Sequence, residues 1–207
     1  MIDPTKLVTP SDSVSLKEEF LLFCILAVGK NSDIAAQKLG SLLEGKAEGV
    51  TPFSYLRGRD IGALVLTAKT GQYKRVAAAI SSVILRDVTR IKLEDLLNTP
   101  GIGPKSARFF LSRTREGVRF AVLDTHILKW ARSLFEDFPE STPTSEKSYQ
   151  KWESLCLLLM EAKFPGVSPA EADLRIWLSY SNRQPNKQKE NYESQTARKK
   201  PDRAAHG

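Results

Sequence analysis

The sequence predicts an all-α protein with two lobes, and three observations support this fold class. Apolar residues recur at helical spacing in most segments, as Val76, Ile80 and Val83 illustrate. No stretch sustains the alternation of apolar and polar residues that is typical of a strand. Ser, Asn, Asp and Pro also stand before many of these segments, at positions where they cap or open a helix.

The first half of the chain begins with a segment expected to be loose, residues 1–15, followed by six predicted helices. Ser15 is the expected cap of the first helix, which is apolar nearly all round and should therefore be central to the core. Asn31 or Ser32 should cap the second helix. The predicted helical ranges are 16–29, 32–43, 52–56, 61–67, 73–86 and 92–97.

In the second half of the chain, the predicted helical ranges are 104–112, 120–135, 145–162 and 169–180. The range 120–135 is either helical throughout or begins with an extended piece at 120–123. The helical domain should cover residues 16–180. We expect a central lobe at about 50–135 and a second lobe built from the N- and C-terminal helices together. Residues 181–207 are polar and basic, which predicts a disordered tail.

Composition excludes several classes of protein. Apolar residues make up 41% of the 207, enough for a core, but no run of 18 apolar residues predicts a membrane-spanning helix. Cys24 and Cys156 each lie in an apolar helical run and read as buried thiols. The absence of a cysteine cluster excludes a zinc or iron–sulfur site built on thiolates. We expect an intracellular protein, cytoplasmic and nucleoid-associated or nuclear.

The chain is basic, with a formal net charge of +7 and a pI near 9.4. The tail holds seven Lys or Arg against three Asp or Glu, so that the body carries only about +3. Such a charge permits nucleic-acid binding but does not by itself indicate it.

A tight turn between two predicted helices carries the first chemical signal. Its sequence is Pro-Gly-Ile-Gly-Pro-Lys, ending at Lys105. Glycine tolerates positive φ, and Pro104 suits the first position of a helix. The N–H groups at such a helix start favour an anion such as phosphate. The alternative is an ordinary αα-hairpin on which Lys105 is a solvated surface residue.

A second signal lies 19 residues further on, where Asp124 interrupts the apolar run Val-Leu-Asp-Thr-His-Ile. One interpretation is an N-cap, which contributes about 1 kcal/mol. The other is a partly desolvated carboxylate that faces the same cavity as Lys105. A helix, a turn and a short extended link fit the spacing, and the two interpretations are compatible.

Residues 97–132 together resemble the helix-hairpin-helix and Gly/Pro-Asp signature of the endonuclease III superfamily of DNA glycosylases. The Pro-Gly-Ile-Gly-Pro-Lys-Ser-Ala and Leu-Asp-Thr-His runs carry the match, and Tyr-Lys-Arg-Val-Ala at 73–77 extends it loosely. The resemblance implies the two-lobed all-α fold of this superfamily, with the DNA groove between the lobes.

The resemblance also implies the activity, that of a bifunctional DNA glycosylase and AP lyase on double-stranded DNA. Lys105 would attack C1′ of a flipped-out damaged or modified nucleotide to form a Schiff base, and β-elimination would then cut the strand. Asp124 would remain ionised and stabilise the positive charge on the sugar. We expect a monomer with no membrane contact, no side-chain metal site and a possible monovalent cation against the hairpin carbonyls. The residues expected to bind the DNA backbone are Thr99, Gly101, Gly103, Lys105 and Ser106.

The C-terminal half narrows the resemblance to one branch. The four cysteines of the iron–sulfur members are missing, and the helix containing Ser168 to Trp177 resembles that of the short 8-oxoguanine DNA glycosylases. In that branch the terminal carboxylate takes part in base recognition, whereas here 27 residues follow Tyr180. The excised base therefore stays open, with 8-oxoguanine the leading hypothesis.

Aromatic residues supply the remaining candidates. Trp177 could stack on the flipped base or could be a core residue, whereas Trp130 and Trp152 read as core. His126 either packs beside Asp124 or acts directly. Three other functions compete: a non-catalytic DNA-binding module, a monofunctional glycosylase in which Asp124 activates water, and a nuclease. Lys105 argues against the second, and the lack of clustered acidic residues argues against the third.

Overall fold

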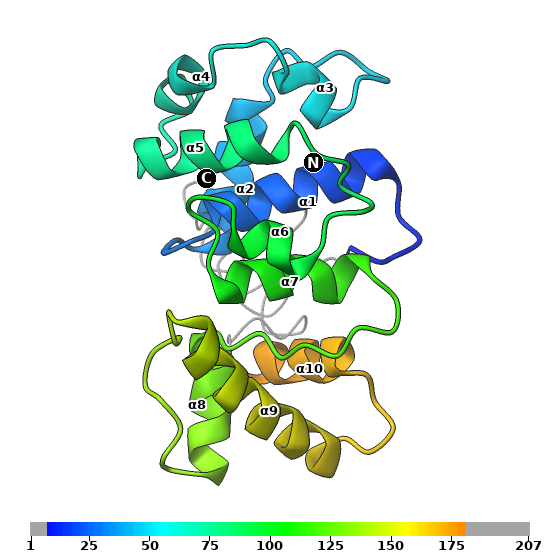
Figure 1. Cartoon of the computed structure of the whole chain (residues 1–207), viewed down its shortest axis with the longest axis vertical. Coiled ribbons are helices and arrows are strands. Elements are labelled where there is room, and N and C mark those ends of the chain that lie inside the picture. Colours follow the sequence, from blue (N-terminus) through cyan, green and yellow to red (C-terminus); the bar gives the residue numbers. More distant parts are fainter. Residues whose placement is uncertain (1–7, 181–207) are drawn as a thin grey trace, which may run out of the picture.

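The computed structural model describes residues 8–180, and all regular secondary structure within this range is helical, which confirms the predicted fold class (Figure 1). The expected disordered tail, 181–207, and the first seven residues of the expected loose segment lie outside the described residues. In chain order the helices are α1 (Val14–Leu26), α2 (Ser32–Leu42), α3 (Pro52–Leu56), α4 (Ile61–Thr67), α5 (Tyr73–Val83), α6 (Leu93–Leu97), α7 (Pro104–Thr114), α8 (Thr125–Leu134), α9 (Glu146–Lys163) and α10 (Pro169–Tyr180).

The helices form two lobes, each with its own cluster of buried apolar side chains. The hairpin lobe consists of α1–α7, and its cluster runs from Val8 to Leu111. The C-terminal lobe consists of α8–α10, and its cluster runs from Ala121 to Ile176. Figure 1 shows the hairpin lobe above and the C-terminal lobe below, joined by the link at residues 115–124.

This division corrects the one expected from the sequence. The N-terminal helix does not pair with the C-terminal one around a central lobe of residues 50–135. Instead α1 packs on α2, α3, α5 and α7, whereas α10 packs on α8, α9 and α7. The reason is that the middle of α1 is covered mainly by helices of the hairpin lobe, and α10 covers the apolar surface of α8 and α9 instead.

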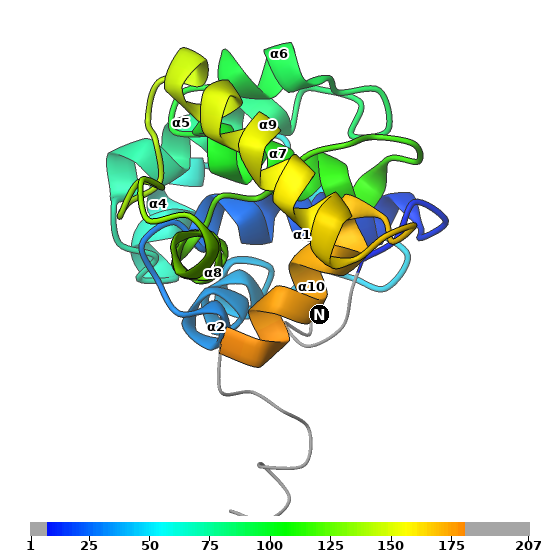
Figure 2. The ribbon, with the colours of Figure 1, turned by 90° about the horizontal axis from the view of Figure 1, so that it is seen from below.

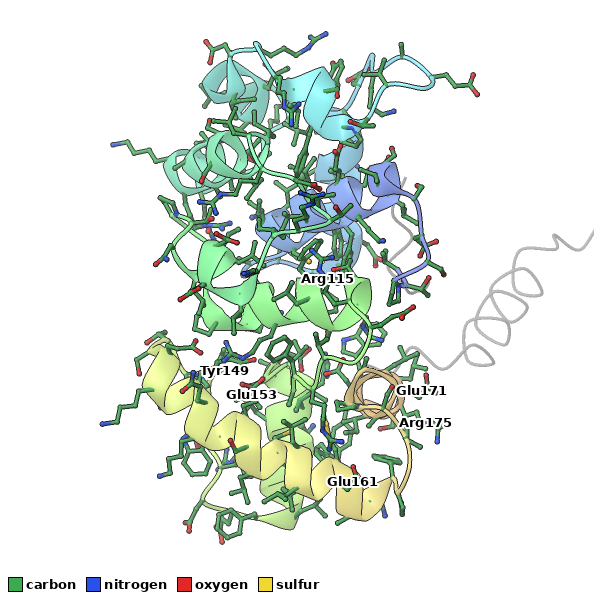
Figure 3. The ribbon with its side chains drawn as sticks, turned by 45° about the vertical axis from the view of Figure 1, so that its right-hand side comes forward. Arg115, Tyr149, Glu153, Glu161, Glu171 and Arg175 are labelled. Atoms are coloured by element: carbon green, nitrogen blue, oxygen red, sulfur yellow. The ribbon has the colours of Figure 1, made fainter. Side chains whose placement is uncertain are left out.

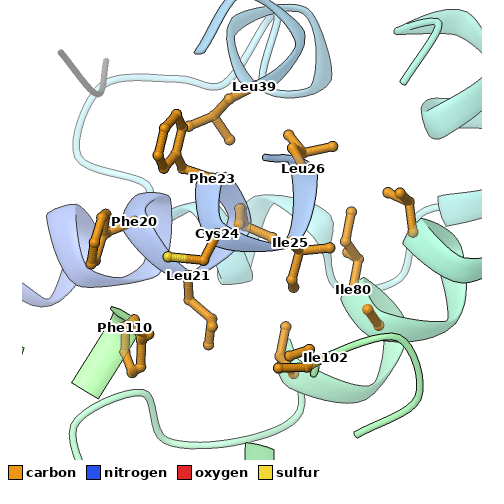
Figure 4. Close-up of a cluster of buried hydrophobic side chains, with 14 of the residues drawn as sticks. Phe20, Leu21, Phe23, Cys24, Ile25, Leu26, Leu39, Ile80, Ile102 and Phe110 are labelled. Carbon is orange, nitrogen blue, oxygen red and sulfur yellow. The ribbon is translucent and has the colours of Figure 1, made fainter. Parts of the chain in front are cut away.

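The core around α1 explains its uniformly apolar sequence. Every residue from Phe20 to Leu26 is buried. Figure 4 shows Leu21, Cys24 and Ile25 pointing into a cluster that also contains Ile102 and Phe110. The hairpin and the start of α7 are therefore anchored directly on α1.

Two helix starts differ from the predictions. Ser13, not Ser15, caps α1, because its hydroxyl accepts the N–H of Leu16 at 3.2 Å. Residues before α1 are also less loose than expected, since Val8 is buried. The helix predicted from residue 120 begins only at Thr125, because residues 120–123 form an extended link and Asp124 caps α8.

Helix α7 joins the lobes. It belongs to the hairpin lobe through Ala107 and Phe110, yet two of its arginines form buried ion pairs with the C-terminal lobe. Arg108 pairs with Glu153 of α9 at 2.7 Å, and Arg113 pairs with Asp173 of α10 at 3.1 Å. In Figure 2, where the molecule is seen from below, α9 crosses over α7.

Candidate active site

The hairpin between α6 and α7 presents unpaired N–H groups at the start of α7. The first intrahelical bond runs from the N–H of Ala107 to the carbonyl of Gly103. The N–H groups of Gly103, Lys105 and Ser106 therefore precede that bond, while Pro104 has none to offer. This arrangement suits an anion such as a DNA phosphate.

Arg75 of α5 holds this hairpin against α1. Its guanidinium donates to the carbonyls of Gly101 at 2.8 Å and Ile25 at 2.9 Å, and to the side-chain oxygen of Gln72 at 2.5 Å. Burial lowers the pKa of the Arg75 guanidinium. Gln72 in turn donates to the carbonyl of Val28. Three helix ends are thus tied together at the point where the hairpin turns.

Gly101 is required at the centre of this tie. Its φ is +83°, in the left-handed region that favours glycine. A Cβ at this position would lie 2.5 Å from Cγ of Arg75. Any side chain would therefore strain the turn and push Arg75 from its carbonyl partners.

The predicted backbone-binding residues do not all remain candidates. Gly101 and Gly103 are exposed, and Lys105 is half-buried at the same edge. Ser106 is buried, with 7% of its surface exposed. Thr99 is the most buried of the five, with only 2% of its surface exposed. Its hydroxyl donates to the carbonyl of Asp95 and its N–H to that of Leu96, so neither donor is free for a phosphate. Thr99 therefore uses both donors to shape the turn.

Asp124 is the N-cap of α8, as one of the two interpretations predicted. Its Oδ1 accepts the N–H groups of His126 and Ile127, each at 2.9 Å. Both bonds use the same oxygen, and the side chain is only half-buried at the edge of a cavity. The capping role thus leaves Oδ2 for a second function.

A cavity of about 960 Å³ between the lobes brings the predicted residues together. Its wall includes Lys105 from α7, Asp124 before α8 and Trp177 from α10, together with residues 27–32, which lead from α1 into the start of α2. Lys105 is thus not the fully solvated residue of the alternative interpretation. Its ammonium lies 5.9 Å from the ring centroid of Phe109. A flipped-out nucleotide is the kind of ligand that such a cavity can enclose.

Sequence reasoning missed a buried ion pair in this wall, Arg113 with Asp173. Burial raises the pKa of the Asp173 carboxyl to about 7, although Arg113 opposes the rise; Asp124 adds to it, and Lys105 opposes it. Among the described residues, Oδ1 of Asp173 and Nε of Arg113 have no hydrogen-bond partner. The available signal was a pair of charged residues on the apolar faces of α7 and α10.

The three tryptophans lie in two different environments. Trp130 belongs to the apolar cluster of the C-terminal lobe and Trp152 packs against it. Trp177 instead lines the cavity half-buried, with its ring 6.1 Å from that of His126 at 80°. Burial raises the pKa of the Cys24 thiol, also in the cavity wall, which keeps it protonated and unreactive.

Two other kinds of site are absent from the described residues. Within residues 8–180, no group of three or more His, Cys, Asp or Glu side chains is placed to hold a metal ion. None of the described helices combines the length and hydropathy that a membrane crossing requires.

The fold matches two crystal structures of archaeal and bacterial glycosylases. One is the 8-oxoguanine glycosylase/lyase of Methanocaldococcus jannaschii in complex with a 15mer DNA containing 8-oxoguanine, with a TM-score of 0.60, 18% identity and 84% of each chain covered. The other is the 8-oxoguanine DNA glycosylase of Thermotoga maritima, with a TM-score of 0.57, 22% identity and 81% of each chain covered. These likenesses concern the fold alone.

Sequence relatives carry the assignment further, although no protein-family model matches the chain. The 8-oxoguanine DNA glycosylase/AP lyase of Thermoplasma acidophilum is 31% identical over 179 residues, which cover 81% of this chain and 80% of the relative. Its counterpart from Thermoplasma volcanium is 29% identical over 189 residues, with 85% of each covered. With the hairpin, the aspartate that caps α8 and the two-lobed fold, this similarity shows that the chain belongs to the helix-hairpin-helix family of DNA glycosylase/AP lyases.

Proposed function

We propose that this enzyme excises 8-oxoguanine from double-stranded DNA through a Schiff base on Lys105 and then cuts the strand by β-elimination. The observation that carries the proposal is the shared cavity, where Lys105, Asp124 and Trp177 meet from three separate helices. The names of the two relatives and of the matched structures support the choice of base.

Lys105 acts as the nucleophile in this proposal. Its Nζ forms a bond to C1′ while the bond from C1′ to the base breaks, and the base leaves with the electron pair and takes up a proton. The nitrogen gives up one proton, the bond from C1′ to the ring oxygen O4′ breaks, and O4′ takes up a proton, which leaves a protonated Schiff base between Lys105 and the opened sugar. β-Elimination then removes a proton from C2′, forms a double bond between C2′ and C3′, and breaks the bond from C3′ to the 3′-phosphate oxygen, so that the phosphate leaves with the electron pair.

Asp124 supplies electrostatic stabilisation. Its Oδ1 is fixed by two backbone N–H groups, so the carboxylate is held in one orientation before the substrate binds. Positive charge develops on the sugar as the base leaves, and a preorganised negative charge beside it lowers the barrier. The carboxylate is not consumed in the reaction.

Trp177 and the hairpin bind the substrate. The indole in the cavity wall offers a flat face for the flipped base. The N–H groups of Gly103, Lys105 and Ser106 would hold a backbone phosphate, a contact that positions DNA without reading its sequence. A monovalent cation at the hairpin stays a prediction. Monomeric action also stays a prediction.

Borohydride trapping tests the proposal. Duplex oligonucleotides would carry 8-oxoguanine, uracil, thymine glycol or an abasic site, and reduction would convert any Schiff base into a stable adduct. We expect adducts with 8-oxoguanine and with the abasic site, and none with Lys105→Gln. Lys163→Gln, which removes the same charge from the exposed end of α9, should trap like the wild type.

Asp124→Asn separates the two roles of that residue. Base removal should slow by about 100-fold or more while DNA affinity stays nearly unchanged, because asparagine can still cap α8. A large loss of affinity would instead indicate a purely structural cap. No adduct on any substrate, abasic DNA included, would refute the lyase assignment of Lys105.

A further inference from the structure

The link that carries Asp124 is held by side chains of the C-terminal lobe. Residues 121–123 are buried yet lie outside any helix, so their polar backbone groups need partners from elsewhere. The hydroxyl of Tyr149 accepts the N–H of Leu123 at 2.8 Å and donates to the carbonyl of Ala121 at 3.1 Å. The carboxylate of Glu153 accepts the N–H of Ala121 at 3.2 Å. Two side chains of α9 thus fix the backbone directly before Asp124.

The same two side chains are fixed by Arg108 of α7. Its Nε donates to the second oxygen of Glu153 at 2.7 Å, and both terminal nitrogens donate to Glu146. The guanidinium also lies over the ring of Tyr149, 4.5 Å from its centroid. Arg108 follows Lys105 by one helical turn. An unbroken chain of contacts therefore runs from the turn that carries Lys105 to the backbone that carries Asp124.

Burial makes this network costly as a source of stability alone. Tyr149 has no exposed surface, Arg108 is 1% exposed and Glu153 is 7% exposed. Burial raises the pKa of Glu153 despite the guanidinium beside it. Well-packed apolar residues often stabilise a core as well as a buried ion pair does, so the network supplies fixed geometry more readily than stability. Figure 3 shows Tyr149 and Glu153 on the side of α9 that is turned toward the hairpin lobe.

We propose that Arg108, Glu153 and Tyr149 are positioning residues for the reaction, which set the place of Asp124 relative to Lys105 across the two lobes. The proposal rests on the function proposed above, since it assigns these residues to the geometry of that site. Base removal requires both groups to be aligned on one sugar, and a misplacement of about 1 Å can cost about 100-fold in rate. DNA binding depends on the hairpin and should not require this alignment.

Tyr149→Phe is the sharpest test, because it keeps the ring and removes only the hydroxyl that bridges Ala121 and Leu123. We expect the single-turnover rate of base excision to fall by about 10- to 100-fold. The dissociation constant for DNA should stay within about twofold of the wild-type value. Trapping on a preformed abasic site needs Lys105 but no base removal, so its rate should stay within about threefold of the wild-type rate. The control is Tyr55→Phe, which deletes a tyrosine hydroxyl bonded to the carbonyl of Glu44 in the hairpin lobe and should change none of these values.

A second variant guards against a folding defect, which thermal unfolding would detect. Thr142 is half-buried at the rim, and its hydroxyl donates to the carbonyl of Leu123 at 2.7 Å. Thr142→Val should therefore slow excision about threefold to tenfold at unchanged DNA affinity. A folded Tyr149→Phe protein that excises at the wild-type rate overturns the positioning role. So does a parallel loss of excision, trapping and affinity, which indicates general structural damage. A wild-type protein that traps no DNA refutes the proposed function, and the positioning role with it.

Discussion

Replacing Asp173 by asparagine should change how the stability of the protein depends on pH. Burial raises the pKa of this carboxyl from 3.8 to about 7, while Arg113 beside it opposes the rise and Asp124 adds to it. In the unfolded chain the carboxyl regains its ordinary pKa. Between these two values the folded protein holds a proton that the unfolded chain has released.

The sign and the size of the effect follow from that proton. Where the folded state binds more protons, the free energy of unfolding falls as pH rises, by about 1.4 kcal/mol per pH unit. The interval from 3.8 to about 7 spans roughly three units, which corresponds to a loss of about 4 kcal/mol. Below pH about 4 and above pH about 7 the contribution of Asp173 should be constant.

Urea unfolding of the wild type and of Asp173→Asn at several pH values between about 4 and about 8 measures this loss. The difference in unfolding free energy, wild type minus variant, should decline by about 4 kcal/mol across the range. Asp137→Asn, at an exposed acid, should give a flat difference. A flat difference for Asp173→Asn, or one that rises with pH, would show that Arg113 holds the carboxylate ionised. It would refute the claim that burial outweighs Arg113 in setting the pKa of Asp173.

Two further substitutions test the hairpin and the first helix. Gly101→Ala should weaken DNA binding about tenfold or more in a titration, because the new Cβ would displace Arg75. The control is Gly117→Ala, which should leave the affinity unchanged. Gly117 also has a positive φ, but the space around it is open. Equal affinities of these two variants would show that the contacts of Arg75 do not hold the hairpin in the conformation that binds DNA. Ser13→Ala should lower the unfolding free energy by about 1 kcal/mol, because the N-cap of α1 is lost. Ser15→Ala should leave it unchanged. If chemical unfolding shows the larger loss for Ser15→Ala, then Ser15 is the cap, as expected from the sequence.

Most of the helices and the candidate nucleophile could be predicted from the sequence, because they depend on residues that are close together in the chain. The starts of α3 and α4 at Pro52 and after Asp60 were predicted correctly, because proline and capping residues act within one helical turn. The hairpin and Asp124 were predictable for the same reason, since each is a short motif with its own geometry. Where two caps competed within three residues, as at Ser13 and Ser15, local chemistry did not decide between them.

The partition into lobes and the buried polar network were decided only by the tertiary structure. An apolar helix such as α1 must be covered, but its sequence does not say which helices cover it, and the hairpin lobe does so here. Arg108 and Glu153 look like ordinary surface charges in the sequence, and only long-range contacts between α7 and α9 bury them. By itself the sequence thus determined most of the helices, the turn and the candidate site residues, because neighbours along the chain control them. The alignment of those side chains in one cavity depended on partners about 30 to 60 residues away, whose energies arise only once the two lobes have packed.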